Sequence, residues 1–228
     1  VLQNADVCLT VSETWVESFK VLGSKNVKLI TNGFDVDDFE VRERENDKFI
    51  IGHFGLLNHL RNPKNLWKTL HDLCDENPDF NMKLEIRLSG NIDTEVLQNI
   101  TQYFHLKNKV EVLGYLSHKE VLREYNESSV LLLLLFNSES GVGNYPGKIF
   151  EYFAAKRPIL GFGPKESDTQ KLMEKTESGN YHYYEDVNLK ENIISLFENK
   201  EEFVVSDEIN NFTRKKLTKQ LSVLLNKM

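Results

Sequence analysis

Short apolar runs alternate with amphipathic stretches along most of the 228-residue chain, and this alternation constrains the fold more than any other feature. The apolar runs predict strands at Phe49–Phe54, Lys83–Leu88, Val110–Leu113, Val130–Phe136 and Ile159–Phe162, with a weaker one near Tyr181–Tyr184. The amphipathic stretches predict helices near Pro63–Glu76, Thr94–His105, Lys119–Glu127 and Gly147–Ala155. Strands that alternate with helices are typical of βαβ units. We therefore predict an α/β fold with a mostly parallel sheet flanked by helices.

The segment Gly147–Tyr152 carries the clearest chemical signal in the chain. It follows a polar loop, Asn137–Tyr145, and Pro146, a residue that the first turn of a helix tolerates. Free N–H groups at a helix start and the ammonium of Lys148 favour an anion. Glu151 lies one turn further on the same face. The pair suits the phosphates and the ribose hydroxyls of a nucleotide, whereas the simpler alternative is a βαβ crossover whose lysine is only solvated.

Two common nucleotide motifs do not match. A P-loop needs a glycine five positions before its Gly-Lys pair and a hydroxyl residue after the lysine, and the chain has Val142 and Ile149 there. The Gly161–Gly163 segment follows a strand, but Glu166 stands where a dinucleotide fingerprint needs its third small residue. The sequence therefore indicates neither the hydrolysis of a magnesium-bound nucleoside triphosphate nor a dinucleotide site.

Composition narrows the classes of partner and compartment. A net charge of −7 argues against nucleic acid, because binding to a phosphate backbone needs a basic surface. The longest apolar run, Val130–Phe136, is far shorter than the roughly 20 residues of a membrane-spanning helix. Cys8 and Cys74 lie far apart, and no His, Cys and carboxylate cluster has metal-ligand spacing. We therefore expect a cytoplasmic protein with no bound metal.

Five segments, in sequence order along nearly the whole chain, resemble one enzyme family. They are Asp6–Ser12, Ile30–Phe39, Gly52–Leu66, Val110–Tyr115 and Gly147–Pro158. The last, GKIFEYFAAKRP, resembles the donor-site helix of retaining GT-B glycosyltransferases of family 4 (glycosyl transferases group 1), in the branch with Pro-x-Lys-x-x-Glu-Tyr. The others resemble the last strand of the acceptor domain, the interdomain crossover, the first donor-domain strand with its basic pair, and the segment that lines the nucleobase pocket.

The resemblance implies the Rossmann-like, C-terminal nucleotide-sugar-binding domain of such an enzyme. The implied reaction transfers a sugar from a nucleoside diphosphate sugar to an acceptor with retained configuration. No cofactor is implied, because the nucleotide sugar is a substrate, and fixed cations replace the divalent metal of other sugar transferases. The implied acceptor is a glycan or a lipid-linked molecule bound by an N-terminal domain, which leaves peripheral association with the cytoplasmic face of a membrane open. Uridine or guanosine, the sugar and the acceptor are not distinguished.

By the resemblance, cations and backbone amides meet the charge that develops on the departing diphosphate. Lys148 and Arg61 take the catalytic roles, with Lys64 as the alternative to Arg61, and Glu151 binds the ribose hydroxyls. The remaining donor-binding positions are Gly55, the amides of Gly147 and Ile149, and a nucleobase wall of Tyr115 and Leu116. In the simpler interpretation, Arg61 and Lys64 are only surface residues at a helix start, although cations there interact unfavourably with the helix dipole. Tyr115 and Leu116 would then be ordinary core residues.

The chain departs from the family pattern at the donor sugar. Many members carry Glu-x7-Glu, and Glu151 matches the second glutamate, but the first falls on Gly143. That role is vacant or is taken by the loop through Glu139 or Asn144. The vacancy keeps two alternatives open: a non-catalytic nucleotide-sugar-binding subunit, and an epimerase or hydrolase of the same fold. His53 ends a strand near the site, although a lone histidine is more often structural.

The resemblance also divides the chain into three parts. Residues 1–40 correspond to the tail of the acceptor domain and the crossover, and residues 41–205 to the donor domain. Residues 206–228 are predicted to form one long helix that returns toward the acceptor domain. The chain begins at Val1, in a strand-like pattern, so it resembles a piece of a longer protein. Because the acceptor half is absent, we expect this fragment alone to be inactive.

Overall fold

The computed structural model describes residues 1–40, 46–198 and 203–227. Within these residues, six strands form a parallel sheet in the order β5-β4-β3-β6-β7-β8. The strands are β3 (Phe49–Phe54), β4 (Leu84–Ser89), β5 (Val110–Gly114), β6 (Val130–Leu134), β7 (Ile159–Phe162) and β8 (Gly179–His182). The predicted α/β, Rossmann-like class with a mostly parallel sheet is confirmed.

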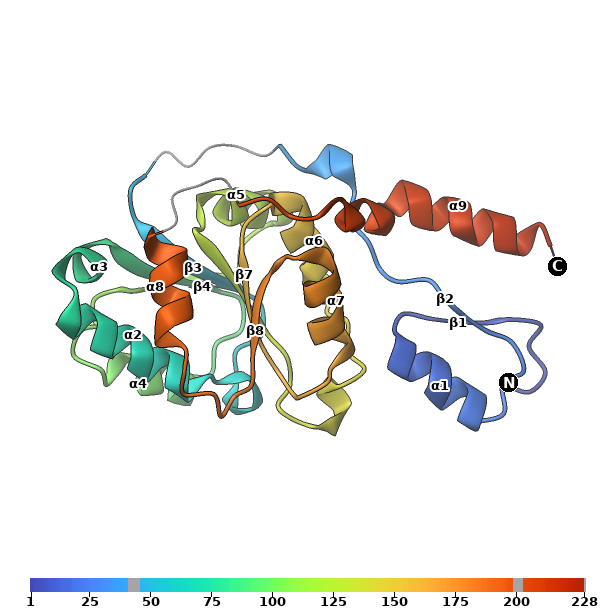
Figure 1. Cartoon of the computed structure of the whole chain (residues 1–228), viewed down its shortest axis with the longest axis horizontal. Coiled ribbons are helices and arrows are strands. Elements are labelled where there is room, and N and C mark those ends of the chain that lie inside the picture. Colours follow the sequence, from blue (N-terminus) through green and yellow to red (C-terminus); the bar gives the residue numbers. More distant parts are fainter. Residues whose placement is uncertain (41–45, 199–202, 228) are drawn as a thin grey trace.

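Helices cover both faces of this sheet (Figure 1). One face carries α2 (Lys64–Glu76), α3 (Pro78–Lys83), α4 (Thr94–Thr101) and α8 (Lys190–Glu198), and the other carries α5 (His118–Glu127), α6 (Lys148–Ala155) and α7 (Asp168–Thr176). Alternate residues of β6, beginning with Val130, pack into the first core, and those between them, beginning with Leu131, pack into the second. Burial on both faces explains why this strand is a continuous apolar run.

Local capping sets the helix starts. The Ser117-x-x-Glu120 pattern forms a capping box at the start of α5, in which the Ser117 amide donates to the Glu120 carboxylate at 2.7 Å. Asn77 caps α3 by accepting from the Phe80 amide at 3.0 Å. That short helix was not predicted, and neither were α7 and α8.

The prediction of one long helix from Ser206 to the C-terminus is wrong. The described part of this segment forms a 3-10 helix, η4 (Asp207–Phe212), and then α9 (Arg214–Leu225). Between them Thr213 is extended, with φ −70° and ψ 138°. The cause is tertiary: the Phe34 amide donates to the Phe212 carbonyl at 3.1 Å, and the Arg214 amide donates to the Phe34 carbonyl at 2.8 Å. This bridge with the crossover interrupts the helix.

The N-terminal segment forms a small unit beside the sheet (Figure 1). β1 (Cys8–Thr10) and β2 (Val27–Leu29) pair in parallel, and α1 (Glu13–Val21) connects them. The crossover then carries a short turn, η1 (Val36–Asp38), before the main sheet begins. The boundaries at residues 40 and 205 stay predictions.

The strand order creates a topological switch next to β3. From β3 the chain proceeds to β4 and β5 on one side, and then returns to β6 on the other side. Loops that leave neighbouring strands in opposite directions open a crevice at the carboxyl edge of the sheet, and ligands of open α/β sheets bind there. We therefore expect a ligand crevice between the segments that follow Phe54 and Leu134.

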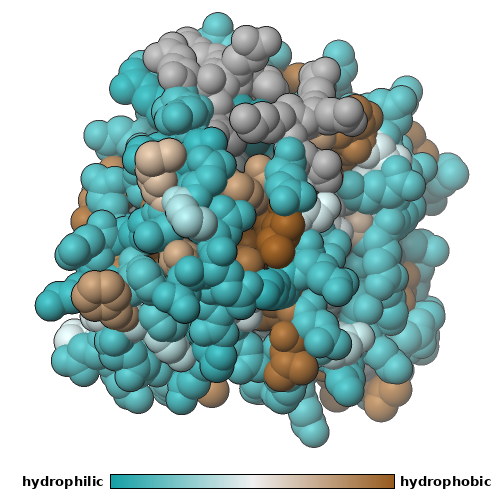
Figure 2. Space-filling model, turned by 60° about the vertical axis from the view of Figure 1, so that its left-hand side comes forward, coloured by the Kyte–Doolittle hydropathy of each residue, from teal (hydrophilic) through white to brown (hydrophobic). Residues whose placement is uncertain are grey.

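The surface shown in Figure 2 is largely hydrophilic, and its apolar side chains lie in small, separate patches. None of the helices in the described part of the chain has the length and apolar character that crossing a bilayer requires.

Candidate functional site

Lys148 lies over the end of β3, at the topological switch. It is the first residue of α6, and its ammonium donates to the Phe54 carbonyl at 2.5 Å. Gly55, which follows this carbonyl, has φ +144°, and a Cβ there would lie 2.2 Å from the Lys148 Nζ. Only glycine therefore leaves room for the ammonium in this position. The structure brings together two of the predicted site residues.

Arg61 is the second cation of this crevice. It ends a 3-10 turn, η2 (His59–Arg61), and its guanidinium lies 4.0 Å from the centre of the Phe136 ring, just beyond β6. Its Nε is buried without a hydrogen-bond partner. A buried donor without an acceptor is costly, so this N–H group is suited to an anionic or polar acceptor.

Both cations have lowered pKa values. Burial, followed by repulsion from Arg61, lowers the pKa of Lys148 to about 8, and Glu151 partly opposes this shift. Burial also lowers the pKa of Arg61. Among the described residues, no carboxylate forms an ion pair with either side chain. Two neighbouring, partly desolvated cations without a counter-ion are the arrangement that a bound diphosphate would neutralise.

His53 lies behind the cations and belongs to the core. Its ring is fully buried, with Nδ1 3.0 Å from the Leu132 carbonyl and Nε2 3.3 Å from the Leu56 carbonyl. Burial, and then the charges of Lys148 and Arg61, lower the pKa of His53 to about 3. This histidine therefore has a structural role, because its neutral ring links β3 to the Leu132 carbonyl of β6.

Glu151 lies one turn after Lys148 and faces a cavity of about 440 Å³. Its Oε2 accepts from the Tyr125 hydroxyl at 3.0 Å, and its Oε1 lies 3.5 Å from Nε2 of His118. The other lining residues are Ile30, Thr31, Asn32, Gly33, Gly147, Arg214, Leu217, Thr218 and Leu221. The carboxylate is 30% exposed, so its oxygens remain accessible to a ligand in this cavity.

A glycine shelf, made of Gly55, Gly90 and Gly114, lies at the ends of β3, β4 and β5. All three have positive φ, at +144°, +104° and +67°. The Gly55 amide donates to the Ser89 carbonyl at 2.7 Å, and the Gly90 amide donates to the Gly114 carbonyl at 2.8 Å. A Cβ at Gly90 would lie 2.6 Å from the Gly55 carbonyl oxygen. The first two glycines thus allow close packing of Lys148 and of the neighbouring backbone, whereas Gly114 has open space where its Cβ would be. Gly90 is a member that sequence reasoning missed.

The other predicted residues lie in different environments. Tyr115 is 95% exposed and Leu116 is half-buried, so Tyr115 is not plain core. Lys64 is exposed at the start of α2, and within the described chain no side-chain hydrogen bond joins it to Arg61. Gly147 is exposed, with open space where its Cβ would be. The Ile149 amide is not free as expected, because it donates to the Pro146 carbonyl at 3.0 Å.

The position of the absent first glutamate is filled by α1. A Cβ at Gly143 would lie 2.9 Å from Cγ2 of Thr14 and 3.3 Å from Nε1 of Trp15. A glutamate therefore does not fit there unless α1 moves. In residues 1–40, 46–198 and 203–227, no group of three or more His, Cys, Asp and Glu side chains is placed to hold a metal ion.

Comparison with known proteins adds a fold-level relationship. No family model and no curated sequence matches the chain. Sucrose-phosphate synthase from Thermosynechococcus elongatus superposes with a TM-score of 0.69 at 16% identity, covering 99% of this chain and 59% of its own. A mutant of S. aureus TarM, solved with fondaparinux, α-GlcNAc-glycerol and UDP, superposes with a TM-score of 0.72 at 14% sequence identity. The superposition covers 99% of this chain and 45% of the TarM chain. The lipopolysaccharide outer core galactosyltransferase WaaB superposes with a TM-score of 0.69 at 15% sequence identity. The superposition covers 98% of this chain and 63% of the WaaB chain.

These structural neighbours are GT-B glycosyltransferases. At such low identities the likeness establishes the fold: an α/β, Rossmann-like unit of the GT-B type. The chain spans about half to two thirds of the length of these neighbours.

Proposed function

We propose that this chain is the nucleotide-sugar-binding part of a glycosyltransferase. The observation that carries the proposal is the pair of partly desolvated cations, Lys148 and Arg61, at the topological switch, together with the buried Nε of Arg61, which has no hydrogen-bond partner among the described residues. Glu151 lies one helical turn from Lys148, and the glycine shelf begins at Gly55, next to the Lys148 ammonium. The positive charge suits a diphosphate, the carboxylate suits ribose hydroxyls, and the shelf with Tyr115 suits a nucleobase.

The proposed chemistry is stabilisation of the leaving group. As the bond between the sugar and the diphosphate breaks, negative charge grows on the diphosphate oxygens. The ammonium of Lys148 and the guanidinium of Arg61 are fixed beside the sheet edge before the reaction, so they stabilise this charge without reorganisation. The guanidinium can also bind two oxygens at once. Retention of configuration and membership of family 4 belong to the proposal as the resemblance implies them.

Two alternatives share the same site. Because α1 fills the space beside Gly143, the loop offers no carboxylate at that position to the donor sugar, and this favours a non-catalytic nucleotide-sugar-binding subunit as the second candidate. An epimerase or hydrolase remains the third, since a fold does not fix a function. Turnover by this chain alone is not expected, because transfer requires that both reactants be held together.

Calorimetric titration of the chain with UDP and GDP tests the proposal. We expect saturable binding of at least one of them, and we expect it to persist in excess EDTA because Lys148 and Arg61 supply the positive charge. Addition of the corresponding nucleotide sugar should then show binding without release of the sugar. Absence of binding by both diphosphates, with a folded chain, would contradict the proposed function, and loss of binding in EDTA would contradict the metal-free site.

Glu151→Gln should reduce the preference for ribose over 2′-deoxyribose nucleotides by roughly three- to tenfold. The substitution keeps the shape but removes the charge, and hydrogen bonds to an ionised acceptor are about twice as strong as neutral ones. The affinities of both nucleotide types are measured in the parent and the variant. Glu95→Gln, an exposed carboxylate on α4, is the matched control. Equal discrimination in the parent and Glu151→Gln would place the ribose elsewhere.

A further inference from the structure

The loop that leads to Lys148 is fixed by donors from two other elements. The carbonyls of residues 142–144 accept, in that order, from the Asp168 amide at 2.8 Å, the Ser12 hydroxyl at 2.7 Å and the Thr169 hydroxyl at 2.6 Å. Asp168 and Thr169 begin α7, whereas Ser12 directly precedes α1. Three successive carbonyls are therefore bound by side chains or backbone distant in the sequence.

The carboxylate of Asp168 in turn binds the start of α1. It accepts from the Thr14 amide at 2.8 Å and from the Thr14 hydroxyl at 3.0 Å. Ser12 is the N-cap residue of α1, yet its side chain does not cap that helix, because its hydroxyl is bound to the loop. Asp168 thus supplies the missing acceptor for the first turn of α1 from 154 residues away. It is only 1% exposed, which makes these hydrogen bonds hard to replace by water.

The same loop has a third link to α1. The Tyr145 hydroxyl donates to the Glu13 carboxylate at 2.6 Å, and the Tyr145 side chain is 6% exposed. The next residue, Pro146, accepts from the Ile149 amide in the turn that begins α6. Contacts with α1 and α7 therefore run along the loop up to the turn that carries Lys148.

We propose that Asp168 and Ser12 are positioning residues for the anion site. They join the start of α1 to the loop at residues 142–145 and thereby hold the turn that carries Lys148 over the end of β3. The ligand of that site is the one assigned under the proposed function, on which this inference rests. Because coupling between two sites is reciprocal, a diphosphate bound at Lys148 should also stabilise the docking of α1.

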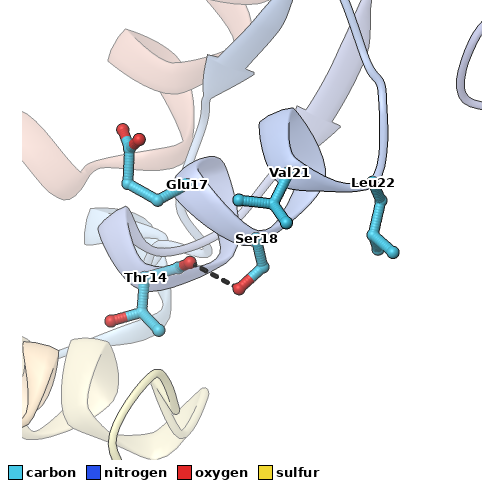
Figure 3. A pocket seen from close by; sticks show the side chains of 5 residues that line it. All are labelled: Thr14, Glu17, Ser18, Val21 and Leu22. Atoms are coloured by element: carbon cyan, nitrogen blue, oxygen red, sulfur yellow. Dashed lines mark hydrogen bonds between the residues drawn. The ribbon is translucent and has the colours of Figure 1, made fainter.

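Three single variants and one control test this coupling. Ser12→Ala removes only the hydroxyl that binds the loop, and Asp168→Ala removes both contacts with Thr14. Ser18→Ala is the control, because the Ser18 hydroxyl donates to the Thr14 carbonyl within α1, at 2.9 Å (Figure 3). Tyr145→Phe tests the third link. Hydrogen exchange of the loop amides and calorimetry with UDP, GDP and the bare nucleosides are the measurements.

We expect the amides of residues 142–145 and of Gly147 to exchange roughly three- to tenfold faster in Ser12→Ala and Asp168→Ala, as the loss of one or two hydrogen bonds predicts. Diphosphate affinity should fall by a similar factor, and nucleoside affinity should stay unchanged, because only the phosphates contact Lys148. Ser18→Ala should match the parent in each respect. In the parent, a bound diphosphate should slow exchange in the first turn of α1.

Two results separate this inference from the proposed function. Variants that unfold at lower temperature but keep the loop exchange and the diphosphate affinity of the parent would overturn the positioning role and leave the site intact. A parent that binds no diphosphate would overturn the proposed function. In that case the exchange rates still decide the coupling, since unchanged rates in Ser12→Ala and Asp168→Ala would refute it.

Discussion

Replacement of Lys148 by alanine is expected to weaken the binding of a nucleoside diphosphate about ten- to a hundredfold. A charge-assisted hydrogen bond contributes roughly 1.5–3 kcal/mol, and this ammonium is partly desolvated and has no carboxylate partner among the described residues. Calorimetry on a folded variant is the measurement. The bare nucleoside should bind the variant and the parent equally well, and an unchanged diphosphate affinity would exclude the assigned role.

The pH dependence of diphosphate binding tests the role of Lys148 in a second way. Since the pKa of Lys148 in the unliganded protein is about 8, the ammonium loses its proton as the pH rises through this value, and affinity should fall between pH 7 and pH 9. The terminal phosphate, with a pKa of about 6, is ionised throughout this range. In Lys148→Arg the cation does not titrate there, so the decline should be much shallower. A decline of equal size in that variant would assign the titration to another group.

The strands of the main sheet and the helices α2, α4, α5 and α6 were predictable from the sequence, because the burial of their residues produces local apolar and amphipathic patterns. The run that begins at Val130 is apolar at every position, since β6 is buried on both faces. The break at Thr213 was not predictable, because the hydrogen bonds that cause it come from Phe34 in the crossover. Sequence patterns describe neighbours along the chain, and this interruption is made by a segment far away.

The candidate site likewise combines features that local sequence shows with features that arise only from contacts between distant segments. A helix start with Lys148 and Glu151 is a local pattern, and the resemblance added Arg61. The unsatisfied Nε of Arg61 and its contact with Phe136 depend on two loops that meet only in the folded sheet. The sequence likewise showed that a glutamate is absent at Gly143, but the reason, which is close packing against α1, appears only in three dimensions.

Gly55→Ala should reproduce most of the Lys148→Ala defect although it leaves the lysine in place. The new Cβ would lie 2.2 Å from the Lys148 Nζ, so the ammonium would have to leave the end of β3. At φ +144° alanine is also strained, by roughly 1–3 kcal/mol. Gly23→Ala is the control for backbone strain, because Gly23 also has positive φ, at +92°, follows α1, and a Cβ there would meet only the side chain of Gln3, at 3.1 Å.

A double-mutant cycle separates displacement of the ammonium from general damage. In the parent, Gly55→Ala should weaken diphosphate binding by about tenfold or more, in line with the loss of one charge-assisted contact. In the Lys148→Ala background it should have little further effect on affinity, because the group that it displaces is already absent. Its cost in stability should remain in both backgrounds, and Gly23→Ala should lower stability without changing affinity. If the effects of Gly55→Ala and Lys148→Ala on affinity add fully, then Gly55 acts independently of Lys148, and the ammonium is not held over the end of β3 when the diphosphate binds.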